Sequence, residues 1–525
     1  MFLKSCRVIL RCVCGIPPIF FSPNTGVCLR PTMHHDLSFA STTHEHRVPA
    51  GRNYVLPVTI FFFSLLTLLL AASERLLQDP DTFWHIAVGE RLWRTGIFPR
   101  TDELSHTFAG SPWIAKEWLS QLILYGSYAI AGWSGVAFVT AATIASSLSL
   151  LLVWFLRRVK MTVSLDLIFA VIILSCYGFT ARPLIFFHPL LILWVGGLIS
   201  AREKNTSPSF WLIPVLALWA NLHASFTIAF VVASLFGLEA IATAERSARQ
   251  GVATRWGAFG LAALASTGIT PYGYEPLFIT FKLFGDNEAV HYISEWQPLE
   301  FDLIGICAAA ALIGSLGILL ISPRRNFWRI LLISAIGSLM IRHMRFTGLF
   351  AIVDAMSLVG PLVHHFPALR ARKFQGRLNS RIKPALGLAA LISTTAVVTF
   401  YISPKPKAEN TPFAALAAAM AAGVSGPVFN DYDFGGYLIS QGYKTFIDGR
   451  SDQLFGGGFF KSLAAAEESK TADEFYGILD RYGCTWALVK SKSKAQAKIG
   501  ASARWVLIYQ DEFAAVYTRK VGQAL

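Results

Sequence analysis

The chain has 525 residues, of which 54% are hydrophobic and only 15% charged, a composition that excludes an ordinary soluble protein of this size. Its formal net charge of +14 would suit a nucleic-acid partner, but the basic residues are confined to particular loops. The seven cysteines show no paired spacing, so a disulfide framework is not expected.

The first 54 residues resemble neither a folded domain nor a clean signal peptide. We therefore expect residues 1–54 to be an N-terminal cytoplasmic segment that could be disordered. Met1 and Met33 are alternative starts of the chain, and the later start would remove the four early cysteines.

Eleven apolar runs between residues 55 and 402 are candidates to cross a bilayer, which takes roughly 20 helical residues. They cover 55–72, 134–156, 164–180, 184–200, 209–222, 225–243, 256–270, 303–321, 327–341, 346–363 and 384–402. The apolar segment 117–132 is broken by Gly132 and is predicted to be an interfacial helix within a large first outer loop, 73–133. The expected fold class is a polytopic α-helical membrane protein with about eleven transmembrane helices.

Lysine and arginine near the ends of the spans indicate how the chain is oriented, because cytoplasmic loops are enriched in them. Five alternate loops together contain 17 basic residues and two acids: 157–160, 202–204, 245–255, 323–329 and 370–383. Residues 271–302 lie in an opposite loop and contain six acids and one lysine. We therefore expect a multi-pass protein of the plasma (bacterial inner) membrane, with the N-terminus in the cytoplasm and the chain after residue 402 outside.

Residues 403–525 are predicted to form a soluble α/β domain packed over the outer mouth of the bundle. The runs typical of strands are 426–430, 444–448, 485–490, 504–510 and 514–519. A helix is expected at 471–483, closed by Gly483, and a hairpin around Asp511 and Glu512. This region has 14 basic and 12 acidic residues, so it offers no basic surface for nucleic acid, and no nucleic-acid partner is expected.

Polar stretches from distant parts of the chain all fall on the predicted outer side. Besides the tail, they are DPDTFWH (79–85), WIAKEW (113–118), TARP (180–183), NLHAS (221–225), HYISEWQP (291–298) and RHMRF (342–346). Ionisable groups at a membrane edge are costly to desolvate and are candidates for function. Any single stretch could instead cap a helix or anchor an interface, but their common side favours one site.

Sugars and other activated groups reach an outer membrane surface on lipid carriers, because nucleotide sugars are absent there. A transferase acting there needs a carboxylate that orients or deprotonates the acceptor and cations that neutralise the leaving phosphate. Asp79, Asp81 and Glu117 could supply the carboxylate. Arg342 and Arg345 could supply the charge, because the arginine fork matches phosphate oxygens.

In order along the chain, these stretches resemble the GT-C superfamily of integral-membrane glycosyltransferases, most closely the oligosaccharyltransferase catalytic subunits. DPDTFWH is similar to the family's first-loop motif, which implies Asp81 as the catalytic or metal-binding carboxylate and Asp79 as its support. YISEWQP is similar to the flexible-loop motif, which adds Glu295 to the catalytic candidates as the glutamate that contacts the acceptor.

The same resemblance implies binding sites for the two substrates. RHMRF is similar to the family's lipid-phosphate motif, so Arg345 is expected to bind the carrier phosphate, together with Arg342 and Arg182. The tail segment 430–452 is similar to the acceptor region, although the family's paired tryptophans are missing. It implies an acceptor-binding group that comprises Asp431, Tyr432 and, from the first loop, Glu117.

The resemblance also implies a bound metal ion, but this sequence lacks some of the expected ligands. The family's second-loop acidic pair should lie near residues 180–189, where this chain has only Arg182 and His188. The remaining candidate ligands for Mg²⁺ or Mn²⁺ are Asp81, Asp79 and His188, and no other cofactor is expected. Because a hard dication prefers several oxygen ligands, we expect less dependence on metal than the resemblance implies.

The function that these patterns favour is a membrane glycosyltransferase. It would transfer a sugar or oligosaccharide from a polyprenyl-(pyro)phosphate carrier to an acceptor glycan, lipid or protein on the outer face of the plasma membrane. One alternative is a lipid or sugar transporter or flippase, which should show repeated halves and charges near the midplane. A second alternative is a non-catalytic GT-C-like assembly partner.

Overall fold

The computed structural model describes residues 54–283, 292–371 and 382–520, and residues 53–525 form one compact unit. Nearly all of the predicted N-terminal segment 1–54 lies outside the described residues. The same holds for His291 in the predicted outer loop and for most of the last basic loop, 370–383.

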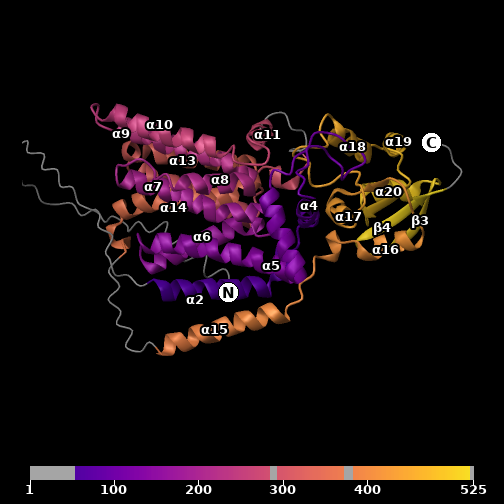
Figure 1. The fold of residues 1–525 in the computed structure, drawn as a ribbon, viewed down its shortest axis with the longest axis horizontal. Coiled ribbons are helices and arrows are strands. Elements are labelled where there is room, and N and C mark those ends of the chain that lie inside the picture. The colour runs from indigo at the N-terminus through magenta and orange to yellow at the C-terminus, as the bar shows by residue number, and fades with distance from the viewer. Residues whose placement is uncertain (1–53, 284–291, 372–381, 521–525) are drawn as a thin grey trace, which may run out of the picture. The chain divides into compact units, whose positions relative to one another are not determined.

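The first part of this unit is a bundle of helices that lie side by side (Figure 1). Its helices are α2 (Val55–Ala71), α5 (Trp118–Leu156), α6 (Met161–Ser175), α7 (Phe187–Glu203), α8 (Leu212–Leu222), α9 (Thr227–Thr243), α10 (Arg249–Ser266), α12 (Leu303–Leu320), α13 (Pro323–Arg342), α14 (Thr347–His365) and α15 (Ile382–Tyr401). Each predicted span coincides with one of these helices.

Six helical segments in the described part of the chain are long and apolar enough to cross a membrane. They are Trp118–Leu156, Met161–Gly178, Pro183–Glu203, Ala224–Thr243, Leu303–Leu320 and Met344–His365. Three further helices are apolar but shorter, Val55–Ala71, Leu212–Leu222 and Gly387–Thr399. A membrane protein with several spans is therefore supported, whereas the total of eleven spans stays a prediction.

Helix α5 contains the break that the glycine at 132 predicts. Ala131 and Gly132 leave the helical conformation, and Gly132 has φ 58°, a left-handed value that glycine adopts without steric cost. The segment before the break corresponds to the predicted interfacial helix at 117–132, and the segment after it belongs to the bundle. The break therefore divides α5 into two helical segments, one before the bundle and one within it.

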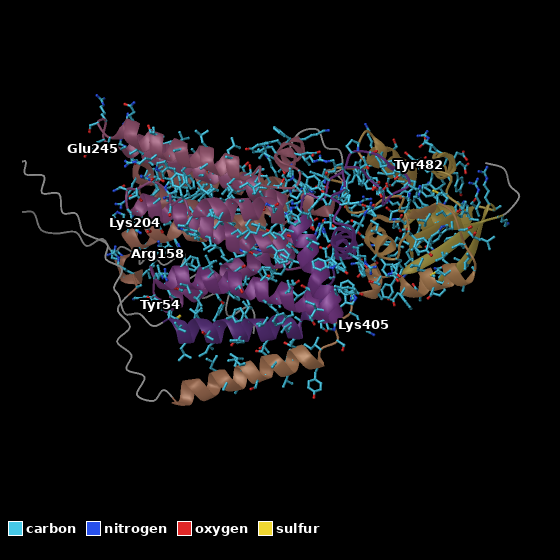
Figure 2. The ribbon with its side chains drawn as sticks, in the orientation of Figure 1. Tyr54, Arg158, Lys204, Glu245, Lys405 and Tyr482 are labelled. Atoms are coloured by element: carbon cyan, nitrogen blue, oxygen red, sulfur yellow. The ribbon has the colours of Figure 1, made fainter. Side chains whose placement is uncertain are left out.

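The basic loops gather at one end of the bundle. Figure 2 shows Arg158, Lys204 and Glu245 at that end, and Lys405 at the opposite end, where the chain leaves α15. An ion pair of 2.8 Å between Arg158 and Glu203 joins two of these loops. The structure therefore places the basic loops on a common side, as the charge pattern predicts.

Two short helices, α3 (Ser73–Leu76) and α4 (Asp81–Thr95), lie in the first predicted outer loop. Asp79 accepts a hydrogen bond of 3.0 Å from the backbone N–H of Asp81, which satisfies a donor at the start of α4. Helix α4 ends at Gly96, whose φ of 65° closes the last turn. Its first turn therefore lies at a fixed position beside the bundle.

The C-terminal region contains a four-stranded sheet with the order β1-β2-β4-β3. Its strands are β1 (Val428–Asn430), β2 (Trp486–Lys490), β3 (Trp505–Gln510) and β4 (Ala514–Arg519). Strand β1 is parallel to β2, and the other pairs are antiparallel. The helices of this region are α16 (Phe413–Ala421), α17 (Gly435–Ser440), α18 (Phe459–Glu468), α19 (Asp473–Arg481) and α20 (Lys494–Ala501).

Most of the predicted C-terminal elements are present, including the 511–512 hairpin and the helix before Gly483. The prediction of a strand at 444–448 is wrong. Thr445 pairs instead with the first loop, where its N–H donates to Leu104 and forms an isolated bridge at Ser105. The N–H of Phe446 donates to the Asn430 side chain at 2.8 Å, so the segment cannot join the sheet.

The first loop and the C-terminal region share hydrophobic cores. One core combines Trp84 and Trp113 from the first loop with Phe429 and Phe446 from the C-terminal region. A second core sets Phe83 of α4 among residues of the sheet. Burying these large side chains together stabilises the contact by roughly 1.5–3 kcal/mol for each side chain, so the two regions form one structural unit above the bundle.

Candidate functional site

A cavity of about 140 Å³ lies where the first loop, the bundle and the C-terminal region meet. Its lining residues come from six described stretches of the chain, 81–121, 182–187, 223–228, 280 with 293–296, 345–349 and 432–453. All six polar stretches that the sequence places on one side, together with the tail, contribute to this cavity. It is therefore the candidate functional site.

The Arg182 guanidinium lines the cavity and lies among three carboxylates. Its Nη2 donates to Oδ2 of Asp81 at 2.6 Å, and its Nη1 lies 3.3 Å from Oδ2 of Asp79. Nη1 also donates to Glu295. Pro183 favours the extended backbone that Arg182 adopts (φ −123°, ψ 160°). Three acids thus surround one cation.

Hydrogen bonds hold Asp79 and the start of α4 against the turn that carries Arg182. Thr180 donates to Oδ2 of Asp79 at 3.2 Å, and Thr82 donates to the Ala181 carbonyl at 2.9 Å. Asp79 also accepts from the backbone of Asp81. Asp79 therefore fixes the position of Asp81, whose carboxylate lines the cavity.

The surroundings of the three acids shift their pKa values in different directions. Burial raises the pKa of Asp81 to about 8 against the opposing charge of Arg182, and the charges of Asp79 and Glu295 raise it further. Burial also raises the pKa of Asp79. For Glu295, burial acts in the same direction, but the charges of Arg182 and Arg345 and the hydrogen bond from Arg182 together lower its pKa below the usual value. Asp81 is thus suited to exchange a proton near neutral pH.

Two further basic side chains line the cavity, Lys116 and Arg345. Lys116 has a side chain only 8% exposed and forms an ion pair with Asp452 of the C-terminal region. The Arg345 guanidinium lies over the ring of Trp296, 4.2 Å from its centroid. Both basic side chains line the cavity, so a phosphate there would meet two positive charges.

Glu117 and two histidines, His85 and His223, also line the cavity. Nε2 of His223 is 3.4 Å from Oε1 of Glu117. Burial lowers the pKa of His223 well below its ordinary value, and burial does the same for His85, so both imidazoles are neutral. Burial raises the pKa of Glu117. These groups can exchange hydrogen bonds with a polar substrate without adding positive charge.

Two helix interruptions with the same local sequence pattern contribute to the cavity wall. His223 separates α8 from α9 in the sequence HASFT, and His343 separates α13 from α14 in HMRFT. Each histidine has an extended backbone, and a three-residue 3₁₀ turn follows it. The second interruption carries Arg345 at the position where the first carries Ser225, so the two turns present different chemistry to one cavity.

The C-terminal region supplies a wall of the site. Tyr432, Gly449, Ser451, Asp452 and Gln453 all line the cavity. Burial, followed by the charge of nearby Asp81, raises the pKa of Tyr432 well above its ordinary value, so its hydroxyl stays protonated. The cavity is therefore incomplete without the C-terminal region.

A fully buried ion triad attaches this wall to the first loop. Arg450 donates to Asp102 at 2.5 Å and to Oδ2 of Asp448 at 2.7 Å, and all three side chains are buried. The Arg450 guanidinium also lies 5.0 Å from the centroid of the Trp113 ring. Breaking a buried pair of this kind costs about 3–5 kcal/mol, so the triad fixes the 448–453 segment over the cavity.

Most of the residues predicted from sequence line this cavity, namely Asp81, Glu117, Arg182, Glu295, Arg345 and Tyr432. Four others do not line it, and one of them, Asp79, contacts Arg182 beside the cavity. Arg342 is exposed on the last turn of α13, and His188 is buried in α7 beside Phe187. The Asp431 carboxylate accepts a hydrogen bond from the backbone N–H of Lys490.

Sequence reasoning missed Lys116, Asp452 and Gly449. The first lies in WIAKEW and the other two in IDGRSD, stretches whose charges stand out in an apolar chain. The ion pair between Lys116 and Asp452 depends on tertiary contacts that local patterns do not contain. The charged residues in each stretch were the only local sign that these segments belong to the site.

The described residues do not fit the predicted metal site. No group of three or more His, Cys, Asp or Glu side chains in that part of the chain is arranged to hold a metal ion. Asp79 and Asp81 are both engaged by Arg182, and His188 does not line the cavity. No catalytic step is therefore assigned to a bound metal.

No protein-family model and no curated protein matches this chain. Among solved structures, the chain is similar to the crystal structure of ArnT from Cupriavidus metallidurans bound to undecaprenyl phosphate. The similarity has a TM-score of 0.46 at 10% sequence identity and covers 89% of this chain and 99% of that chain. The chemistry of the site is argued from its own residues.

Proposed function

We propose that the protein is a membrane glycosyltransferase that uses a polyprenyl-(pyro)phosphate-linked sugar as its donor. The observation that carries this proposal is that Asp81 shares one cavity with Lys116 and Arg345. A carboxylate that titrates near neutral pH suits an acceptor hydroxyl, and two basic side chains suit a leaving phosphate. These are the two requirements of sugar transfer from a lipid phosphate.

In this reaction Asp81 accepts the proton of the acceptor hydroxyl as its oxygen attacks the anomeric carbon of the donor sugar. The bond between that carbon and the phosphate oxygen breaks, and the phosphate leaves with the electron pair. Lys116 and Arg345 neutralise the charge that develops on it. The buried rings of Trp84 and Trp113 border the cavity and suit a sugar face.

We further propose that this chemistry takes place on the outer face of the plasma membrane, with the N-terminus in the cytoplasm and the C-terminal region outside. The clustering of basic loops at one end of the bundle supports this orientation. A reporter that is active only outside should work when fused after residue 525 and fail when fused after Lys204. The reverse pattern would contradict the assignment of the site to the outer face.

The direct test is to incubate the purified full-length protein with undecaprenyl-phosphate-linked sugars and membrane extract as the acceptor source. Sugar-dependent release of undecaprenyl phosphate, together with labelled product, is the expected result. The matched control is Asp81→Asn, which should lose about 100- to 10,000-fold in rate while its thermal unfolding midpoint is retained.

Two outcomes of this assay would contradict the proposal. Equal release by Asp81→Asn and by the unaltered protein would remove the catalytic role of Asp81. Movement of intact lipid-linked sugar across reconstituted vesicles, without release of the carrier phosphate, would instead support the alternative of a transporter or flippase.

A further inference from the structure

The position of Arg182 raises a question that the proposed function does not answer. Lys116 pairs with Asp452 and Arg345 lies over Trp296, whereas the Arg182 guanidinium is engaged by Asp79, Asp81 and Glu295. Three carboxylates thus already offset the positive charge that Arg182 could offer a phosphate.

We propose that Arg182 is a built-in cation whose guanidinium supplies, among Asp79, Asp81 and Glu295, the positive charge that a divalent metal ion supplies in other acid-rich sites. It is a positioning residue, because it acts by holding the Asp81 carboxylate. The inference deepens the proposed function and rests on it for the catalytic role of Asp81. It reassigns Arg182 from the lipid-phosphate group predicted from sequence.

The geometry of the contacts supports this role. The guanidinium is planar and permanently charged, and it presents several donors in a fixed fork. One arm, Nη2, reaches Asp81 at 2.6 Å, while the other arm, Nη1, serves both Asp79 and Glu295. One arm therefore holds Asp81, and the other holds Asp79 and Glu295.

The position of Arg182 in the chain supports it as well. The side chain comes from the turn before α7, Asp79 and Asp81 come from the start of α4, and Glu295 comes from a 3₁₀ turn before α12 (Ser294–Trp296). The cation and the three carboxylates around it thus come from three separate elements. A divalent ion would connect the same elements, but it would need additional oxygen ligands where the guanidinium atoms now lie.

Removing the guanidinium gives a test that does not depend on activity. Arg182→Ala leaves three carboxylates around an empty space, and carboxylate oxygens are the ligands that Mn²⁺ and Mg²⁺ prefer. We expect Mn²⁺ to raise the thermal unfolding midpoint of purified Arg182→Ala and EDTA to reverse the effect. The unaltered protein should respond to neither addition.

The matched control is the double variant Arg182→Ala with Asp81→Asn, which removes one candidate ligand and should reduce the response to Mn²⁺. The proposal is overturned if Mn²⁺ and EDTA shift the unaltered protein, or if Arg182→Ala ignores Mn²⁺. Because the readout is thermal stability, it remains decisive even if the donor class is wrong.

A second test uses transfer activity. Arg182→Ala should lose about 100-fold in rate, as expected when a catalytic group moves by about 1 Å. Added guanidinium ion should restore part of the loss, whereas urea, which has a similar shape and no charge, should restore none. Arg182→Lys should fall between the two, because it keeps the charge and loses the fork.

Equal effects of guanidinium and urea would show that charge at this position is unimportant and would overturn the role. If Arg182→Ala does not fold, the unaltered protein still decides the question. Loss of its activity in EDTA, restored by Mn²⁺, would mean that a metal ion and not Arg182 supplies the charge. Absence of transfer by every form, with the thermal response intact, would count against the proposed function alone.

Discussion

Gly449 lies directly against the carboxylate of Asp81. A methyl group in place of its hydrogen would overlap Oδ1 of Asp81 and come within 2.9 Å of Nε1 of Trp84. Asp81 belongs to the first turn of α4, and Gly449 belongs to the C-terminal segment that is fixed by Arg450. Neither residue can move without disturbing the other, so the candidate base and the C-terminal wall form a single arrangement.

Gly449→Ala should reduce transfer activity by about 100-fold, because the added methyl group displaces the Asp81 carboxylate by a distance that matters for catalysis. Gly456→Ala is the matched control, because no atom lies within 4 Å of a Cβ built there. Rates and thermal unfolding midpoints of both variants provide the measurement. Activity of Gly449→Ala close to that of the control would mean that the Asp81 position is not critical.

The rate of transfer should rise with pH and level off above about 8. Burial raises the pKa of Asp81 to about 8, and a general base is active only when it is ionised. Glu295→Gln removes a negative charge that raises this pKa, so the inflection should move to lower pH. Profiles of kcat/KM for both proteins provide the test, and an inflection that moves upward would exclude this assignment of the base.

Arg345→Ala should lose about 100- to 1,000-fold in kcat, the usual cost of removing a group that stabilises charge in the transition state. Arg342→Ala should stay within about threefold of the unaltered protein, because Arg342 is exposed and does not line the cavity. The two substitutions remove the same side chain from adjacent turns. If they had equal effects, the phosphate would not bind where the cavity places it.

Lys116 and Asp452 should affect the KM for the lipid-linked donor in opposite directions. The donor phosphate competes with Asp452 for Lys116, because the two side chains form an ion pair in the cavity. Asp452→Asn should therefore lower KM about threefold, and Lys116→Gln should raise it about tenfold or more. Glu512→Gln, at the exposed tip of the β3–β4 hairpin, serves as the control. A rise in KM for Asp452→Asn would assign Asp452 to substrate binding instead.

The bundle was predictable because its signal is local. A long apolar run in a membrane has to be helical, and each predicted run coincides with a helix. The predicted bounds are less accurate for helix α13. This helix starts at Pro323, includes Arg324 and Arg325, and continues past the apolar run to Arg342. Its mixed composition keeps it outside the segments that qualify by length and composition.

The site was only partly predictable because its geometry depends on contacts between distant segments. Residues at the membrane edge could be selected by charge, which pointed to Asp81 and Arg345, and the family resemblance added Glu295. The pairing of Arg182 with three acids could not be read from TARP alone, nor could the pairing of Lys116 with Asp452. The failed strand at 444–448 has the same cause, because Asn430 and Leu104 take the hydrogen bonds that a sheet would have used.

The origin of the cavity walls has a consequence for the order in which the protein becomes competent during its synthesis. Asp81 emerges from the ribosome early, but Tyr432 and the segment ending at Gln453 are among the last parts to be made. A growing chain can therefore insert its helices while it still lacks one wall of the cavity. Only when the C-terminal region docks, through Arg450 on Asp102, does the cavity gain its last wall.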